Sequence, residues 1–400
     1  MCVISAAAWV YLVAAHGGFW LTGQRLPPVG DPARSVWPTV AAVVPARNEA
    51  ESLPVTLPGL LAQDYPGEFR VFLVDDNSED GTGGIAAELG EKAARDGGAP
   101  IVVVNGRPRP DGWAGKVWAM NQGLAAATAP ASTTAPAGAD YLLFTDADID
   151  WSPHALRDLV LAAEADDRAL VSQMALLRAR SRWERLIVPA FVYFFAQLYP
   201  FRKVNDPKSG TAAAAGGCML VRRSALEAAG GLDPIRGALI DDVALGTLLK
   251  KRGNRTWLGL TTDVRSARPY PDLASLWHMI ARSAYVQLRY NPLLLAGTIA
   301  GLLLLYVAPP AGVIAALIAA ATTQAQQAAQ IAVAGIAGLV GWALMTASFV
   351  PMLRLYRLSA LRAPALPLIA VLYAAMTADS ARRHYSGRAV SWRGRTAERV

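Results

Sequence analysis

Short apolar runs alternate with helical patterns through the central part of the chain. The apolar runs are 40–44, 70–74, 101–104, 141–144 and 169–174. Stretches with helical character lie between them, at 49–63, 80–95, 116–127 and 153–165. Continuous apolar runs of this length fit strands buried on both faces, and their alternation with helices predicts an α/β fold with a doubly wound, mostly parallel sheet. The low-complexity stretch 128–139 predicts a surface insertion.

Both ends of the chain are apolar. Residues 3–22 form a run about one bilayer span long, without the basic start or the cleavage site of a signal peptide, so we expect an uncleaved membrane anchor over 1–25. A Pro-rich linker is expected at 26–38. After Asn291 the apolar runs are 293–307, 311–320, 331–352 and 364–378. We therefore expect a globular domain over 38–291, a membrane region over 292–380 and a basic tail over 381–400.

Basic residues indicate how the C-terminal region crosses the membrane. The loop 354–362 and the tail from Arg382 are both rich in arginine, which favours the cytoplasmic side. The loop and the tail both lie on the cytoplasmic side if two spans precede Arg354 and an interfacial or re-entrant helix follows at 364–378. Three full spans would place the tail outside. The aromatic stretch 183–200 predicts a helix on or near the membrane, or a buried core helix.

Composition supports a membrane contribution. Charged residues are 17% and hydrophobic residues 53% of the chain, which is low in charge for a soluble enzyme. The net charge is +7, and its basic residues flank apolar segments instead of forming a face with aromatic side chains. We therefore expect the membrane surface, and not nucleic acid, as a partner. Cys2 and Cys218 give neither a disulfide framework nor the spacing of metal ligands.

The apolar run 141–144 ends abruptly in the acidic stretch Asp146-Ala147-Asp148. Open α/β sheets bind ligands beyond the carboxyl ends of their strands, so these carboxylates lie where a ligand site is expected. Carboxylate oxygens suit Mg²⁺ or Mn²⁺, whose coordination substrate phosphates commonly complete. Taken alone the pair is a weak signal, and a solvated acidic turn or a helix N-cap is the alternative. Asp150 could cap the helix near Pro153 or face water.

Other polar motifs also follow apolar runs. Asp75-Asp76 follows one run, and Ser78 or Asp80 could cap the next helix. Gly115-Lys116 at a helix start could dock an anion. An acidic pair, Asp241-Asp242, opens a further helix, where capping is the alternative. The glycines at 81–84 follow the acids instead of a strand, which excludes a dinucleotide-binding fingerprint.

The order of the motifs is more specific than any one of them. PARNE (45–49), DDNSEDGT (75–82), GWAGKVWAMNQG (112–123), DAD (146–148) and DDVALG (241–246) resemble the membrane-associated family 2 glycosyltransferases with a GT-A fold. The chain is similar to the ceramide-glucosyltransferase-like branch and resembles most closely the hopene-associated branch found in bacterial hopanoid gene sets. The resemblance covers roughly residues 38–290 through motifs.

The resemblance implies a role for each matching residue. Pro45, Arg47 and Glu49 would line the nucleotide pocket, Asp75 and Asp76 would bind the uracil or ribose side of the donor, and Lys116 would lie near the donor. Asp146 and Asp148 would hold the metal on the donor diphosphate, and Asp242 would be the catalytic base. These roles suit the chemistry, because the leaving diphosphate needs charge neutralisation and the acceptor hydroxyl needs a carboxylate to take its proton.

The chain departs from the family pattern at the QxxRW box. Its nearest equivalents lie at 279–283 and 287–290, and neither matches fully. Arg282 is the expected diphosphate contact, and Arg289 competes with it. The tail segment 391–395 resembles a cytosolic end-piece of similar transferases and carries no expected chemistry.

We therefore expect an inverting, Mg²⁺- or Mn²⁺-dependent glycosyltransferase. It would move one sugar from a nucleotide-sugar donor to a lipid acceptor. The expected donor is a UDP-sugar, and the expected acceptor is related to hopanoids. The protein would be a multi-pass protein of the cytoplasmic membrane, with its catalytic domain facing the cytoplasm. The alternative is a catalytically silent membrane scaffold or donor-binding protein, against which the intact carboxylates argue. A transporter is disfavoured because the apolar ends hold no charged pairs.

Overall fold

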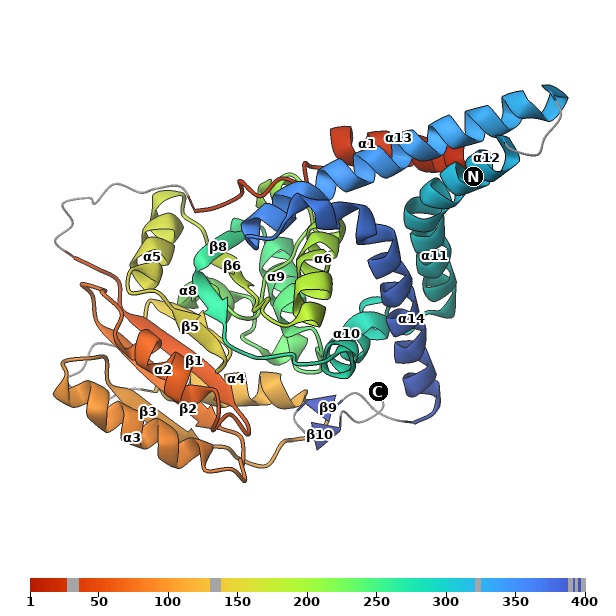
Figure 1. Ribbon diagram of the computed structural model, residues 1–400. Helices are drawn as coiled ribbons and strands as arrows, with labels where there is room; N and C mark the ends of the chain where they lie inside the picture. Colours follow the sequence, from red (N-terminus) through yellow and green to blue (C-terminus); the bar gives the residue numbers. More distant parts are fainter. Residues whose placement is uncertain (27–35, 130–137, 321–324, 388–390, 393–394, 397–400) are drawn as a thin grey trace. The chain divides into compact units, whose positions relative to one another are not determined.

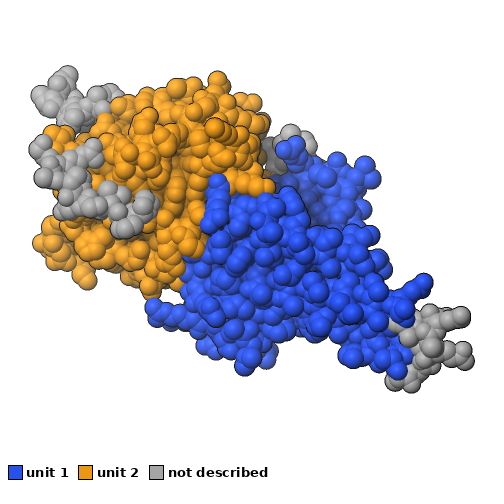
Figure 2. Space-filling view, turned by 90° about the horizontal axis from the view of Figure 1, so that it is seen from above, with its two compact units in different colours: residues 1–22, 179–202, 270–390 blue, residues 23–178, 203–269, 391–400 orange. Residues whose placement is uncertain are grey.

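The computed structural model describes residues 1–26, 36–129, 138–320, 325–387, 391–392 and 395–396 (Figure 1). Most of the expected linker, most of the low-complexity insertion and much of the tail beyond residue 387 lie outside these residues. Two compact units make up the chain, coloured separately in Figure 2. We call them the helical unit (1–22, 179–202 and 270–390) and the sheet unit (23–178, 203–269 and 391–400). Residues 179–202 and 270–291, expected in the globular domain, group with the apolar helices.

The sheet unit contains a mixed sheet with the strand order β3-β2-β1-β4-β7-β6-β8-β5. The strands are β1 (Val40–Ala46), β2 (Phe69–Asp75), β3 (Ile101–Asn105), β4 (Tyr141–Phe144), β5 (Ile149–Trp151), β6 (Leu170–Leu176), β7 (Met219–Arg222) and β8 (Thr256–Ser266). β1 pairs in parallel with β2 and with β4, β2 pairs in parallel with β3, and β6 pairs in parallel with β8. β7 is antiparallel to β4 and β6, and β5 is antiparallel to β8. The expected α/β class and strand positions are confirmed, and β5, β7 and β8 are additional strands.

Helices cover both faces of this sheet. Alternate residues of β1 enter two different hydrophobic cores, with Val40, Ala42 and Val44 in one and Ala41 and Val43 in the other. The first core receives side chains from α2 (Leu53–Leu61), α3 (Thr82–Arg95) and α5 (Ala155–Ala165). The second receives them from α4 (Gly115–Thr128), α8 (Arg223–Ala228) and α9 (Asp241–Lys251). Burial on both faces explains why the strand reads as a continuous apolar run.

The central strands bring three turns together at one edge of the sheet. β1 lies between β2 and β4 and is parallel to both, with Ala46 opposite Asp75 and Val43 opposite Phe144. The carboxyl ends of the three strands therefore meet, and the segments that follow them start side by side. This edge is where open α/β sheets bind their ligands.

The helical unit contains the apolar helices of both ends of the chain. Its main helices are α1 (Cys2–Ala15), α6 (Arg182–Leu198), α10 (Leu273–Gln287), α11 (Pro292–Leu302), α12 (Ala308–Ala320), α13 (Ala325–Leu355) and α14 (Leu366–Tyr385). Three helical segments of the described chain are long and apolar enough to cross a membrane: Pro292–Ala320, Ala329–Leu355 and Ala360–Tyr385. The third is longer than the interfacial helix expected at 364–378. The number of crossings stays a prediction.

Two expected segments of this unit differ in detail from the sequence pattern. The anchor expected over 1–25 is helical only from Cys2 to Ala15. At 1.5 Å per residue this helix is about 21 Å long, shorter than a bilayer core of about 30 Å. α6 buries much of its surface, and the hydroxyl groups of Tyr193 and Ser348 are 2.7 Å apart. The face of α6 that carries Tyr193 is therefore buried, as the alternative of a buried core helix predicts.

Candidate active site

The turns after β1 and β2 are tied together by hydrogen bonds. The backbone N–H of Asn48 donates to Ser78 Oγ at 3.0 Å, and that of Glu49 donates to Thr82 Oγ1 at 2.8 Å. Asp80 Oδ1 accepts from the backbone N–H of Thr82, the first residue of α3, at 3.1 Å. Asp80 therefore serves the start of this helix, while Ser78 links the two turns.

Three of the predicted donor-binding residues lie in these turns. Arg47 Nη1 donates to the backbone carbonyl oxygens of Asp76 and Asn77. Asp75 Oδ1 accepts from the backbone N–H of Ser78 at 3.0 Å. Asp76 is 0% exposed. The structure thus brings Arg47, Asp75 and Asp76 together at the end of neighbouring strands.

Two predicted donor-site residues are not part of these turns. Pro45 lies inside β1, opposite Val74, where it is buried in the sheet. Arg282 lies on α10, in the helical unit, and its side chain is exposed. Its competitor Arg289 follows the same helix with a positive φ of 53°. The role of either arginine stays a prediction.

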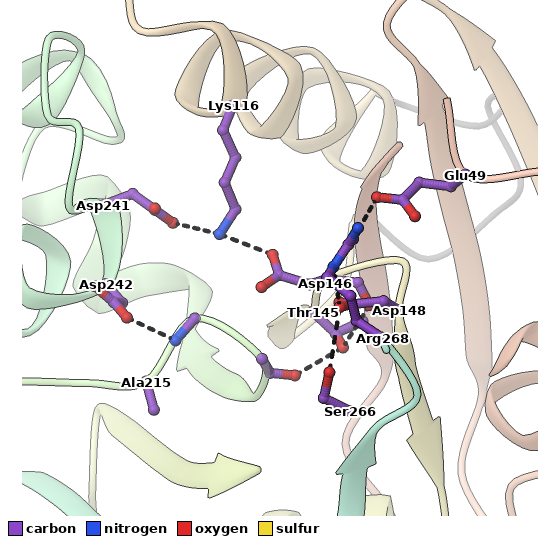
Figure 3. Close-up of polar contacts among 12 residues, drawn as sticks. Glu49, Lys116, Thr145, Asp146, Asp148, Ala215, Asp241, Asp242, Ser266 and Arg268 are labelled. Atoms are coloured by element: carbon purple, nitrogen blue, oxygen red, sulfur yellow. Dashed lines mark hydrogen bonds and ion pairs between the residues drawn. The ribbon is translucent and has the colours of Figure 1, made fainter. Parts of the chain in front are cut away.

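Lys116, at the start of α4, binds carboxylates from two other segments of the sheet unit (Figure 3). Its Nζ lies 2.8 Å from Asp146 Oδ1 and 3.0 Å from Asp241 Oδ2. The second contact is an ion pair without hydrogen-bond geometry. Burial works against the charge of Lys116, but the carboxylates of Asp146, Asp241 and Asp242 outweigh it and raise the pKa of Lys116 above its ordinary value. The ammonium group therefore stays charged at neutral pH.

Asp242 is a partly buried carboxylate held by backbone N–H groups. Its Oδ2 accepts from Gly216 at 2.9 Å and its Oδ1 from Val243 at 2.7 Å. Burial, together with the charge of Asp241, raises the pKa of Asp242 to about 6, although Lys116 and the two N–H groups act in the other direction. A carboxylate with this pKa is mostly ionised at pH 7 and is a stronger base than an ordinary aspartate.

Gly216 is a site residue that the sequence patterns did not single out. A Cβ atom on Gly216 would lie 3.1 Å from Lys116 Nζ, 3.5 Å from Asp242 Oδ2 and 3.7 Å from Asp146 Oδ2. The backbone therefore approaches all three functional groups, and a side chain at this position would crowd the ammonium group of Lys116. The available signal was the pair Gly216-Gly217, since glycine commonly marks a close approach of the backbone to a ligand.

Arg268 was also missed. Its Nη2 lies 2.7 Å from Glu49 Oε1, and its Nε lies 2.7 Å from Asp148 Oδ2 (Figure 3). Ser266 Oγ donates to the same Asp148 oxygen at 3.2 Å. β8 runs in the same direction as β4, so Arg268 follows a strand whose carboxyl end lies at the ligand-binding edge. Arg268 could have been found in the sequence if β8 had been recognised as a strand.

Comparison with known proteins assigns the chain to a class of enzyme. Residues 41–230 match the family described as Glycosyl transferase family 2. Residues 41–230 therefore form a glycosyltransferase family 2 domain. The expectation of a glycosyltransferase enzyme is thereby confirmed. No curated protein matches the chain at a significant level.

A solved structure confirms the GT-A fold of the glycosyltransferase domain. The chain is similar to the mannosyltransferase PcManGT from Pyrobaculum calidifontis, solved in complex with GDP-Man and Mn²⁺, with a TM-score of 0.55 and 21% identity over 96% of this chain and 99% of that chain. Mannosyl-3-phosphoglycerate synthase from Rubrobacter xylanophilus is also similar, with a TM-score of 0.37 and 20% identity over 63% of this chain and 75% of that chain.

The carboxylates of the glycosyltransferase domain fit a divalent cation. Burial, with the nearby charges of Asp148 and Asp241, raises the pKa of Asp146 although Lys116 opposes this. A cation would relieve such crowding of carboxylates. Within the described ranges no three His, Cys, Asp or Glu side chains form a group that could hold a metal ion alone. Substrate oxygens would therefore complete the coordination, as is usual for Mg²⁺.

Proposed function

We propose that this glycosyltransferase transfers one sugar, with inversion, from a nucleotide sugar to a lipid acceptor at the cytoplasmic face of the membrane. The observation that carries the proposal is Asp242, a partly buried carboxylate with a pKa of about 6. Its Oδ2 lies 2.9 Å from Gly216 N, beside the ion pair of Lys116 and Asp146. A carboxylate of this kind is suited to activate a hydroxyl group near neutral pH.

The reaction divides between a base and a leaving-group side. Asp242 would accept the proton of the acceptor hydroxyl as its oxygen forms a bond to the anomeric carbon. The bond from that carbon to the diphosphate oxygen breaks in the same step, and a single in-line displacement inverts the anomeric centre. Lys116 carries a positive charge that would pair with the developing charge on the diphosphate. Arg47, Asp75 and Asp76 would hold the nucleoside.

Asp146 and Asp148 would hold the metal ion. Glu49 binds Arg268, and Arg268 in turn binds Asp148. When bound, Mg²⁺ or Mn²⁺ would neutralise charge on the leaving diphosphate. The Mn²⁺ in the PcManGT complex supports a divalent cation. Arg268 fixes the side chain of Asp148 by a hydrogen bond, which is how groups around a metal site usually orient its ligands.

The donor and the acceptor rest on different grounds. A UDP-sugar is the first candidate donor because of the motif resemblance, and GDP-mannose is the second because PcManGT was solved with it. The three long apolar helices support a membrane-bound acceptor. A hopanoid-related lipid is the first candidate, because the motifs resemble the hopene-associated branch.

The test compares sugar transfer to membrane lipids by wild type and Asp242→Asn. General base catalysis contributes about 10²- to 10⁴-fold, so transfer should fall by at least about 100-fold while donor affinity stays within about twofold. Asp96→Asn is the matched control, since Asp96 is an exposed aspartate at the end of α3. Full transfer by Asp242→Asn would show that the base lies elsewhere.

The silent scaffold is the competing function, and donor binding separates it from an enzyme. UDP-sugars and GDP-mannose are titrated calorimetrically with Mn²⁺, with Mg²⁺ and with a chelator. Metal-dependent binding of one donor supports the transferase, whereas binding of none, together with no transfer, supports the scaffold. Lipid profiling of a deletion strain then identifies the acceptor as the precursor that accumulates.

A further inference from the structure

Three residues of α9 are spaced at one helical repeat and share a face. Asp242, Gly246 and Lys250 lie four residues apart, a spacing that places side chains above one another on a helix. Each of them contacts the same stretch of chain, residues 203–216, which we call the α9-facing segment. This segment connects α7 (Phe201–Asn205) to the site glycine, Gly216.

Lys250 holds the beginning of the α9-facing segment. Its ammonium group donates to the backbone carbonyl oxygens of Lys203 at 3.2 Å, Val204 at 2.6 Å, Asp206 at 3.0 Å and Thr211 at 2.8 Å. An ammonium group has only three N–H bonds, so at least one of them is shared between carbonyls. A single side chain thereby fixes a turn that spans residues 203–211.

Gly246 allows the middle of the segment to lie directly on the helix. A Cβ atom on Gly246 would lie 2.7 Å from the carbonyl carbon of Ala213, 2.9 Å from its oxygen and 3.0 Å from the nitrogen of Ala214. These are backbone atoms, which cannot turn away as a flexible side chain could. Only glycine permits this approach without moving the segment.

Asp242 meets the end of the segment at Gly216, whose N–H it accepts at 2.9 Å. The three contacts follow the chain in order, from Lys250 through Gly246 to Asp242. The helix therefore sets the position of the Gly216 N–H along its own axis. An α-helix rises 1.5 Å per residue, so Lys250 lies about 12 Å along the axis from Asp242. This distance is too long for Lys250 to contact Asp242 directly.

We propose that Lys250 is a positioning residue for the transfer reaction, acting through the α9-facing segment to hold the Gly216 N–H against Asp242. This inference rests on the proposed role of Asp242 as the base. Lys250 does not touch the reacting groups, so its removal should change how Asp242 is held and leave the donor-binding turns after β1 and β2 as they are.

The test variant is Lys250→Met, which keeps the length of the side chain and removes its donors. We expect kcat to fall about tenfold, with the donor Kd within about twofold of wild type. The acid limb of the pH profile should move to higher pH, because the Gly216 N–H lowers the pKa of Asp242 and its loss raises that pKa. The other groups that act on Asp242, which are Asp241, Lys116 and the Val243 N–H, are unchanged by the substitution.

Two further variants separate positioning from general damage. Lys250→Arg keeps a cation with N–H donors and should restore most of kcat and the wild-type pH limb. The exposed neighbour Lys251, replaced by methionine, is the matched control and should behave as wild type. If Lys250→Met does not fold, Gly246→Ala tests the same contact from the middle of the segment, and hydrogen exchange of residues 206–216 should rise in that variant.

The outcomes distinguish this inference from the proposed function. A folded Lys250→Met with wild-type kcat and pH limb overturns the inference, while loss of transfer in Asp242→Asn still supports the base. Full transfer by Asp242→Asn removes the base, and the inference falls with it. A Lys250→Met that loses kcat without moving the pH limb, and that arginine does not rescue, shows a purely structural lysine.

Discussion

The carboxylate of Asp242 differs from that of its neighbour Asp241 in its partners. Asp241 forms an ion pair with Lys116 at 3.0 Å, whereas Asp242 accepts N–H groups from Gly216 and Val243. The ion pair with Lys116 occupies the carboxylate of Asp241, so we expect Asp242 to be the base. The helix start alone does not distinguish the two residues, because adjacent aspartates in a first turn are equivalent in the pattern. Their difference arises from Lys116 and Gly216, which are distant in sequence.

The titration of Asp242 gives a prediction for pH dependence. Its pKa is raised from 3.8 to about 6, chiefly by burial. A base must be deprotonated to act, so activity should be full well above pH 6 and fall about tenfold per unit below it. An ordinary aspartate would keep the rate flat to about pH 5. Measuring kcat from pH 4.5 to 8 with saturating donor checks this, and a flat profile down to pH 5 would contradict the assignment.

The acidic residues of the site could be predicted from the sequence, but two of their partners could not. Asp75 and Asp146 follow apolar runs, so the end of a strand places them. Arg268 and Gly216 reach the site from segments with no such marker. Arg268 bridges Glu49 and Asp148, and any two of these three residues are at least 99 positions apart in the sequence. No local sequence pattern indicates this contact. Long-range electrostatic partners therefore come from the fold and not from the local pattern.

Among the elements, strands with a continuous apolar run were predicted, and β5, β7 and β8 were missed. β1 and β2 have seven residues each and give a clear apolar run. β5 has three residues, and β7 has three apolar residues before Arg222, too few for a period to be recognised. β8 has eleven residues, but Thr261, Thr262 and Asp263 interrupt its apolar pattern. β5 also contains Asp150, which therefore does not cap the helix α5, whose N-cap residue is His154. The missed strands are those that make the sheet mixed.

Close packing of α4 against the sheet gives a prediction at the scale of an element. A Cβ atom on Gly123 would lie 2.4 Å from Val43 Cγ1 and 3.0 Å from Val74 Cγ2. Gly123→Ala should therefore destabilise the protein by about 1–2 kcal/mol, since the cost of overpacking exceeds the gain in helix propensity. Because Lys116 begins the same helix, transfer should also fall by at least about tenfold. Thermal unfolding in detergent and the transfer assay measure the two effects.

The control for Gly123→Ala is the same substitution in another helix. Gly84 lies in α3, and a Cβ atom there would meet no atom within 4 Å. Gly84→Ala should leave transfer unchanged and raise the stability by up to about 1 kcal/mol. Equal melting temperatures for the two variants would show that α4 does not depend on close contact at Gly123.

At the scale of the whole molecule, charge and helix length give different indications of topology. The arginines at 354–362 and after residue 381 favour one cytoplasmic side for both segments. The intervening segment Ala360–Tyr385 is nevertheless long and apolar enough to cross. The positive-inside rule acts on loops near the ends of spans, so it bears directly on these two segments. We therefore keep the prediction of two spans followed by an interfacial helix.

Cysteine labelling in a bacterial host tests this topology. Cys2→Ser removes one thiol, and Cys218 can stay because burial raises the pKa of its thiol to about 12 and keeps it unreactive. Reporters are placed singly at exposed positions, as Asp96→Cys in the sheet unit, Ser359→Cys and Ser386→Cys. An impermeant maleimide should label none of them in intact cells and all of them in inverted vesicles. Labelling of Ser386→Cys alone in intact cells would mean that the helix Ala360–Tyr385 crosses the membrane, and the charge argument would then be wrong.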